Sequence, residues 1–438
     1  MRQMDLFMDD GDLFGRLCSL DYLEKGFKAV WRNKGSAGID GVTIEDFDGR
    51  LEVELFQLSG ELKSWNYKPN PVRRVEIPKP GKGAGVRLLG VPCIRDRVVQ
   101  ATLKLILEPI LDPMFSDNSY GFRPGRNQRQ AVEAAQRIVE AGKEYVVDID
   151  LSKFFDRVCH DRLIARLSRD ISDKRILRLI GMTLRSGVMK DGMVSRTPEG
   201  TVQGSPLSPL LSNVVLDELD WELERRGLEF CRFADDCNIF VWSEKAANRV
   251  MENISKFIES KLKLLVNRDK SKVARSKYVK FLGMTIIAGT IAISAVSMKR
   301  AMVRVKELTP RGTHLTLEKT VECINKWYLG WAVYYSMTQY PSQLHKIEAH
   351  IRRRLRSRIV GQQKKRRHLF NKLTKRGVLR GLAGRTVYSN KGRWALSRTF
   401  ALSKAYPNRY FIKQLGLEIR SDEKHSHWFE PNKWIKVA

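Results

Sequence analysis

Apolar and polar residues follow two different periods along the first 295 residues, which predicts a mixed α+β fold. Between short apolar runs, apolar residues recur every three or four positions, most clearly at 95–114 and 207–226, which predicts core helices. The runs themselves are rich in β-branched and aromatic residues and predict strands at residues 73–77, 145–151, 230–242 and 278–286. The combination predicts a small antiparallel sheet backed by helices.

The last third of the chain is helical in pattern and strongly basic. From residue 297 to the end there are 32 Lys or Arg and 8 Asp or Glu, a net charge of +24, whereas the whole chain of 438 residues carries +30. A field of this sign favours a polyanionic partner. An anionic membrane fits less well, because no basic helix here has a strongly apolar opposite face. The charge therefore predicts that nucleic acid binds in the last third.

Cysteines, histidines and apolar runs exclude several other classes of protein. The six cysteines are scattered and form no Cys-x-x-Cys pair, which indicates a reducing compartment and argues against an appended zinc-bound nuclease. His425 and His427 lack an evident third metal ligand. No apolar run approaches the ~18 residues of a membrane span, and the acidic N-terminus lacks the basic start of a secretory signal. We therefore expect a soluble, cytoplasmic protein with no membrane partner.

An Asp-Asp pair separates the two apolar halves of residues 230–242 and predicts a hairpin with Asp235 and Asp236 at its turn. Adjacent ionised carboxylates repel each other. The pair is therefore either a solvated turn or a site for a hard divalent cation such as Mg²⁺, which takes carboxylate and phosphate oxygens. In the strand predicted at 145–151, Asp148 and Asp150 are two residues apart and point to the same face.

Three further stretches carry glycines or cations that suit a phosphate-bearing ligand. Residues 78–87 predict a hairpin tip with three cations, among them Lys79 and Arg87. This tip is either a solvated loop or a phosphate clamp, because glycines permit close backbone approach while Lys and Arg supply charge. The turn at 119–127 carries two arginines, and residues 200–213 form a glycine turn that leads into a helix.

Taken together, these segments resemble the reverse transcriptases, or maturases, that bacterial group II introns encode. Phe-Ala-Asp-Asp at 233–236 is similar to the family's Tyr-Ala-Asp-Asp, with a Phe for Tyr that removes no carboxylate. The spacing from Lys79 to Arg87 is longer than is usual in the family, which leaves the reach of that loop open. The other motifs follow in the family's order: the N-terminal extension at 35–47, finger motifs at 77–81 and 87–92, an Asp-led motif at 150–156, Gln-Gly-Ser-Pro-Leu-Ser-Pro at 203–209, Asn-Arg-Asp-Lys-Ser-Lys at 267–272 and Phe-Leu-Gly at 281–283.

The resemblance implies a right-hand polymerase: fingers and palm on a small antiparallel sheet, a helical thumb and a basic C-terminal DNA-binding region. Fingers, palm and N-terminal extension are expected over residues 1–295. The thumb or maturase domain is expected over 296–360, and the DNA-binding region and tail over 361–438.

The resemblance also implies which residues carry the chemistry. Two Mg²⁺ ions ~3.5–4 Å apart stabilise the entering and the leaving oxygen of phosphodiester synthesis. Asp150 and Asp235 are expected to be the principal ligands, with Asp236 assisting and Asp148 farther from the metals. Phe155 would lie under the sugar and exclude a 2′-hydroxyl, unless it is an ordinary core residue. The deoxynucleoside triphosphate is expected to meet Lys79, Arg87, Phe155, Gln203, Gly204 and Lys270. Nucleic-acid phosphates are expected to meet Arg123, Arg126, Arg352, Arg353, Arg354, Arg356, Lys364, Lys365, Arg366 and Arg367.

These features predict an RNA-directed DNA polymerase that binds group II intron RNA and assists splicing and retromobility by target-primed reverse transcription. Its expected partners are group II intron RNA, an RNA template with a DNA primer, target DNA and deoxynucleoside triphosphates. A free-standing reverse transcriptase of group II type, acting in repair, phage defence or CRISPR adaptation, has the same sequence features and stays open. A non-catalytic RNA-binding splicing factor is disfavoured, because the three aspartates of the expected metal site are intact.

Overall fold

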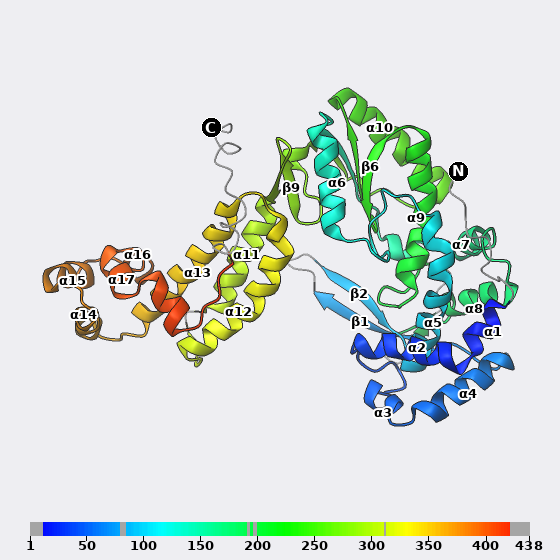
Figure 1. Cartoon of the computed structure of the whole chain (residues 1–438), viewed down its shortest axis with the longest axis horizontal. Coiled ribbons are helices and arrows are strands. Elements are labelled where there is room, and N and C mark those ends of the chain that lie inside the picture. Colours follow the sequence, from blue (N-terminus) through cyan, green and yellow to red (C-terminus); the bar gives the residue numbers. More distant parts are fainter. Residues whose placement is uncertain (1–11, 79–84, 191–192, 196–198, 311, 421–438) are drawn as a thin grey trace. The chain divides into compact units, whose positions relative to one another are not determined.

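Two compact units make up the chain, and the boundary between them falls between Arg275 and Ser276 (Figure 1). Each unit encloses a hydrophobic core of its own. The predicted α+β class is confirmed, since both units combine helices with small sheets. The computed structural model describes residues 12–78, 85–190, 193–195, 199–310 and 312–420.

The first unit is organised around a four-stranded antiparallel sheet in the order β6-β7-β3-β8. Helix α6 (Gln128–Glu140) packs on β6, and α10 (Glu244–Phe257) packs on β3, β7 and β8, as Figure 1 shows in cyan and green. Apolar side chains of β3 and β7 enter the core, which fixes the face of each strand. The strands are β3 (Tyr145–Ile149), β6 (Glu229–Phe233), β7 (Asp236–Val241) and β8 (Lys272–Arg275).

A second sheet of the first unit has the order β2-β1-β4-β5. Its hairpin, β1 (Val72–Pro78) with β2 (Val86–Val91), is antiparallel from the pair Arg73–Val91 to the pair Pro78–Val86. The predicted hairpin is thus confirmed, and its tip, including Lys79, lies outside the described residues. The short strands β4 (Val188–Lys190) and β5 (Met193–Ser195) complete this sheet.

Helices make up most of the rest of the first unit. The helices predicted at 95–114 and 207–226 are confirmed as α5 (Ile94–Leu111) and α9 (Ser208–Arg225). Side chains cap several helix starts; Thr43 and Asp46, for example, form a reciprocal capping box at α3. The remaining helices are α1 (Leu13–Cys18), α2 (Leu20–Arg32), α3 (Ile44–Asp48), α4 (Leu51–Lys63), α7 (His160–Leu167) and α8 (Lys174–Leu184).

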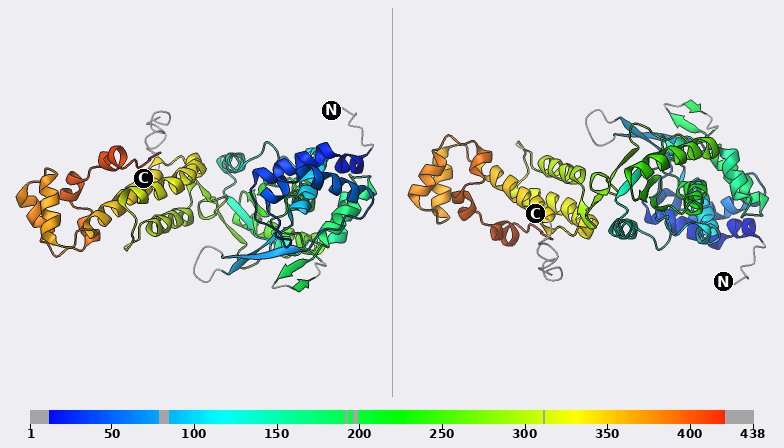
Figure 2. Two further views of the ribbon diagram at one scale, coloured as in Figure 1. Left: turned by 90° about the horizontal axis from the view of Figure 1, so that it is seen from below. Right: turned by 90° about the horizontal axis from the view of Figure 1, so that it is seen from above.

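The second unit joins a small hairpin to a set of helices. Helices α11, α12 and α13 lie side by side, and α14 to α17 (orange to red in Figure 2) follow at one end of them. The predicted strand at 278–286 was wrong in its first half, because Leu282 (φ +49°) and Gly283 (φ +81°) form a turn before β9 begins. The elements are β9 (Met284–Ile287), β10 (Thr290–Ile293), α11 (Ala295–Leu308), α12 (Leu317–Tyr334), α13 (Pro341–Gly361), α14 (Arg366–Lys375), α15 (Arg380–Val387), α16 (Arg393–Leu396) and α17 (Phe400–Ala405).

The packing boundary at Arg275 precedes the expected end of the fingers and palm at residue 295. The hairpin of β9 and β10 belongs to the second unit because Gln339 and Gln343 bond to the backbone of β10. The functional division at 295 and 360 stays a prediction.

None of the helices in the described parts of the chain combines the length and the apolar character that a bilayer crossing requires.

Candidate active site

The hairpin of β6 and β7 ends in a two-residue turn made of Ala234 and Asp235. Phe233 and Asp236 are the last paired residues, and Ala234 has a left-handed φ of +57°. Gly121 lies against this turn, where a Cβ would be 2.3 Å from the Ala234 nitrogen. The Asp-Asp pair therefore lies at a hairpin turn, as its sequence pattern predicts.

Strand β3 brings a third carboxylate to the same edge of the sheet. The antiparallel register of β3 and β7 ends with Ile149 opposite Cys237. Asp150 follows directly, at the position opposite Asp236. Asp148 lies one step inside the ladder. The register thus separates Asp150, at the edge with the turn, from Asp148, within the sheet.

The carboxylates at this edge influence one another and a nearby lysine. Burial raises the pKa of Asp235 above its usual value, the Asp150 carboxylate raises it further, and the Arg87 guanidinium opposes the shift. Lys270 Nζ lies 3.6 Å from Asp150 Oδ1, with both side chains partly exposed. In the described part of the chain, no three His, Cys, Asp or Glu side chains gather closely enough to hold one metal ion. The oxygen donors fit Mg²⁺ held jointly by one or two carboxylates and substrate phosphates.

A buried arginine, Arg232, donates a hydrogen bond to the backbone of this turn. The sequence did not predict this role. Arg232 is fully buried and pairs with the buried Asp220 of α9, with 2.7 Å between Nε and Oδ1. Its Nη1 donates to the Ala234 carbonyl at 3.0 Å and to Asn213 Oδ1 at 3.0 Å. Asn213 in turn donates to the carbonyl of Gly121 at 2.8 Å. The sequence does contain one indication of this pair: an arginine lies inside an apolar strand, and an aspartate lies on the apolar face of a helix.

The segment that carries Phe155 is bonded to the glycine turn that precedes α9. The Thr201 N–H donates to the Phe155 carbonyl at 2.6 Å, and the Gly200 N–H donates to the Val158 carbonyl at 2.8 Å. The Phe155 ring is half-buried and meets the buried Phe154 ring edge to face, with 5.2 Å between centroids. These backbone bonds bring together two motifs that lie some distance apart in the sequence.

Gly204 is required by a contact within the protein. Its φ is +111°, and a Cβ would lie 2.7 Å from the Gly90 carbonyl oxygen of β2. The Gly90 N–H donates to the Gln203 carbonyl at 2.8 Å. The backbone of β2 therefore already excludes a side chain at position 204, and the contact of Gly204 with the nucleotide stays a prediction.

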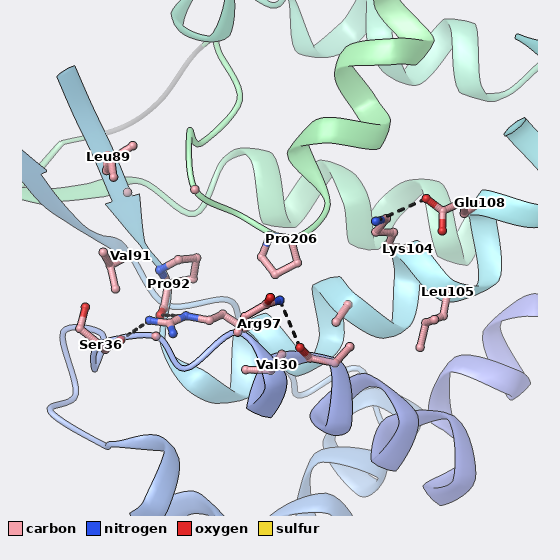
Figure 3. Close-up of a pocket in the computed structure, with 16 residues that line it drawn as sticks. Val30, Ser36, Leu89, Val91, Pro92, Arg97, Lys104, Leu105, Glu108 and Pro206 are labelled. Atoms are coloured by element: carbon pink, nitrogen blue, oxygen red, sulfur yellow. Dashed lines mark hydrogen bonds and ion pairs between the residues drawn. The ribbon is translucent and has the colours of Figure 1, made fainter. Parts of the chain in front are cut away.

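A cavity of about 460 Å³ lies beside Gly204, between β2, α2, α5 and the loop after α2 (Figure 3). The buried Arg97 reaches across one end of it, where Nε donates to the Pro92 carbonyl at 2.9 Å and Nη2 donates to the Ser36 carbonyl. Pro206 forms part of the opposite wall in Figure 3. Sequence reasoning missed this cavity, because its walls come from segments far apart in the chain.

Comparisons with known proteins assign this sequence to a family. Residues 77–286 match the reverse transcriptase (RNA-dependent DNA polymerase) family, and residues 298–377 match the group II intron maturase-specific domain. Protein YkfC of Escherichia coli (strain K12) is 33% identical over 293 residues, which cover 58% of this chain and 76% of that protein. The chain belongs to the group II intron family of reverse transcriptases. The resemblance stated from the motifs is confirmed.

Two further matches cover a smaller share of the other protein than the match to YkfC does. Group II intron-encoded protein LtrA of Lactococcus lactis subsp. cremoris is 32% identical over 261 residues, 60% of this chain and 42% of LtrA. The chain thus spans less than half the length of that relative. A chain of a partial Cas6-RT-Cas1–Cas2 complex matches at 25% identity over 56% of this chain and 42% of that chain, with a TM-score of 0.37, too low to add to the assignment.

Arg123 was expected to contact phosphate, and this expectation was wrong. Its side chain is buried, Nε donates to Asp112 Oδ1 at 2.7 Å, and Nη1 donates to the Ser119 carbonyl at 3.0 Å. The Arg123 guanidinium is therefore bonded within the protein, where it holds the turn after α5. Arg126 pairs with Asp117 and stays partly exposed, so its phosphate contact remains a prediction.

Arginines of α13 bond to residues of their own unit, whereas the sequence predicts that they contact phosphate. Arg352 lies 3.7 Å from the buried Glu348, and Arg356 donates to the Tyr406 carbonyl at 2.9 Å. Such contacts tie α13 to its own unit, and phosphate binding by these two residues remains a prediction. The cations at the start of α14 are exposed: Lys364, Lys365, Arg366 and Arg367.

Arg353 and Arg354 face α11 and α16. The Arg353 guanidinium lies 3.7 Å from the centre of the Trp394 ring. Arg354 Nε donates to Thr309 Oγ1 at 2.8 Å. Both side chains therefore line the region where the ends of three helices meet.

Proposed function

We propose that this reverse transcriptase copies RNA into DNA by two-metal nucleotidyl transfer and binds group II intron RNA, whose splicing and retromobility it assists. The observation that carries the polymerase activity is the register of β3 and β7, which places Asp150 at the edge occupied by Asp235 and Asp236. The match of residues 298–377 to the maturase-specific domain supports the binding of intron RNA. Target DNA is the proposed partner of the basic C-terminal region, because its net positive charge suits a second polyanion.

Each side chain at the edge has a proposed role. Mg²⁺ bound there would stabilise the attacking and the leaving oxygen of the transfer. Asp150 and Asp235 would hold the ions, and Asp236 would assist. Arg87 binds the triphosphate through its guanidinium fork, and Lys79, outside the described residues, adds a point charge. Lys270, now paired with Asp150, would turn toward the leaving pyrophosphate once a metal takes that carboxylate.

The proposal divides the chain by function rather than by packing. Residues 1–295 act as fingers, palm and N-terminal extension, residues 296–360 as the thumb, and residues 361–438 as the DNA-binding region and tail. Gln203 and Gly204 lie beside the incoming nucleotide in this scheme, because their loop is bonded both to β2 and to the Phe155 segment.

Replacing Phe155 with Val is expected to raise the use of ribonucleotides relative to deoxynucleotides by at least about tenfold, because a smaller side chain leaves room for a 2′-hydroxyl. The measurement is the ratio of kcat/KM for a ribonucleoside and a deoxynucleoside triphosphate in single-nucleotide extension. The value for the deoxynucleotide should change little, since the backbone bonds of residue 155 do not depend on its ring. An unchanged ratio would mean that Phe155 is only a packing residue.

One paired assay tests the proposed function. The full chain is expected to extend a DNA primer on an RNA template with Mg²⁺, and to accelerate splicing of a group II intron RNA taken from the flanking DNA. Failure to extend would support the non-catalytic splicing factor and refute the polymerase. Extension without any intron RNA in the flanking DNA would support the free-standing reverse transcriptase and refute the splicing role.

A further inference from the structure

A small polar cavity of the second unit shares no lining residue with the sheet edge of the first unit. It has a volume of about 120 Å³ and lies where the end of α11, the last turns of α13 and the start of α16 meet. We call it the arginine pocket, and its walls include Thr309, Arg354, Arg358, Gly361, Arg393 and Trp394. This volume leaves room for a small oxyanion.

The walls of the arginine pocket carry positive charge without a carboxylate. Three of the lining residues are arginines, and none of the lining residues that the structure describes is Asp or Glu. Arg358 donates to the Thr320 hydroxyl, the Leu315 carbonyl and, at 3.4 Å, the Thr316 carbonyl. Neutral oxygens of this kind orient a guanidinium but do not neutralise it. A cation held in a partly buried wall is stabilised by an anion beside it.

Arg393 lies directly against Gly361 in this pocket. An ideal Cβ at Gly361 would lie 3.0 Å from Arg393 Nη1, so a side chain at position 361 would press on the guanidinium. Arg353 stacks on Trp394 at 3.7 Å and covers that face of the ring. A nucleic-acid base therefore has no free access to that face, and the remaining recognition chemistry of the pocket is that of guanidinium groups. Guanidinium groups bind phosphate oxygens in a bidentate manner.

We propose that the arginine pocket binds one backbone phosphate of a nucleic-acid strand. The inference rests on the proposed function, because the polyanion it needs is the nucleic acid assigned there to the second unit. Phosphates of RNA and of DNA offer the same oxygens, so the pocket positions a strand without reading its bases. The site is distinct from the phosphate contacts expected of the exposed cations at the start of α14.

Replacement of Arg393 with Gln in the full chain tests the pocket. Affinity for a single-stranded 20-mer RNA, and for DNA of the same sequence, is measured by fluorescence anisotropy across a range of KCl concentrations. Loss of one phosphate contact is expected to reduce the slope of log K against log salt by about 0.7 and to weaken binding about fivefold at 0.1 M salt. A loss of affinity for the RNA alone would identify RNA as the strand in the pocket, and a loss of affinity for the DNA alone would identify DNA. No loss in either arm overturns the proposal.

Two further variants separate the pocket from a general effect of charge. Gly361→Ala keeps every charge but presses on Arg393 Nη1, and it should weaken binding in the same arm. Arg249→Gln removes one charge from an exposed position on α10, in the first unit and outside the pocket, and should bind within about twofold of the natural chain. Equal losses for Arg249→Gln and Arg393→Gln would refute the pocket. Absence of salt-dependent binding by the natural chain would instead refute the nucleic-acid function on which the pocket depends.

Discussion

Asp235→Asn is expected to abolish primer extension on an RNA template, with a fall in kcat of about 1000-fold or more. Asparagine keeps the shape of the side chain but loses the negative charge that holds a cation at the turn. Stabilisation of transferring phosphoryl oxygens by metal ions contributes several kcal/mol, and each 1.36 kcal/mol is a factor of ten in rate. The measurement is single-turnover extension with saturating deoxynucleoside triphosphate and Mg²⁺.

Asp148→Asn is the matched control for this variant. It makes the same chemical change on the strand that carries Asp150, but one step inside the ladder. The control is expected to retain extension, whereas equal losses would place Asp148 among the groups that hold metal. Asp235→Asn should fold normally, because it removes a charge that both burial and Asp150 disfavour. It should also still assist splicing, since binding intron RNA does not need this carboxylate.

Arg232→Met is expected to lower the free energy of unfolding by roughly 3–5 kcal/mol, because it leaves Asp220 buried without its cation. Both side chains are fully buried, so water cannot replace the lost partner. The Ala234 carbonyl loses its donor at the same time. Urea unfolding followed by circular dichroism measures the change. The control Arg225→Met, on an exposed ion pair of α9, should change stability little.

The double variant Arg232→Met with Asp220→Leu decides how the pair acts. Removing both charges should restore much of the stability lost by Arg232→Met, since no buried charge is then unpaired. If the pair also positions the turn, the restored protein should still have a reduced kcat with an unchanged KM for the nucleotide. Full recovery of kcat would limit Arg232 to a role in stability.

The sequence predicts the geometry of the edge that carries the three aspartates well, because that geometry depends on local patterns. The β6–β7 hairpin, the strand before Asp150 and the core helices α5 and α9 all follow from residue periods and turn chemistry. Once two strands are adjacent and antiparallel, their register places Asp150 near the turn without further information.

The features that the sequence did not predict depend on contacts between distant segments. Nothing local distinguishes the buried Arg123 from an arginine that faces solvent, and nothing local pairs Arg232 with Asp220. The internal contacts of the α13 arginines likewise depend on how residues 394–408 fold back onto that helix. The periodicity of apolar residues indicates which face of a helix or strand is buried, but it does not identify the residues that pack against that face.

In the ion pair of Lys270 and Asp150, the lysine is the counter-ion of the carboxylate. An exposed pair of this kind contributes at most about 1 kcal/mol, so a divalent ion that arrives with a nucleotide can displace the ammonium at little cost. Under the proposed function, binding of metal by Asp150 would exchange one cation for another. Lys270 would leave Asp150 only when a nucleotide brings the divalent ion, which would couple release of the lysine to arrival of the triphosphate.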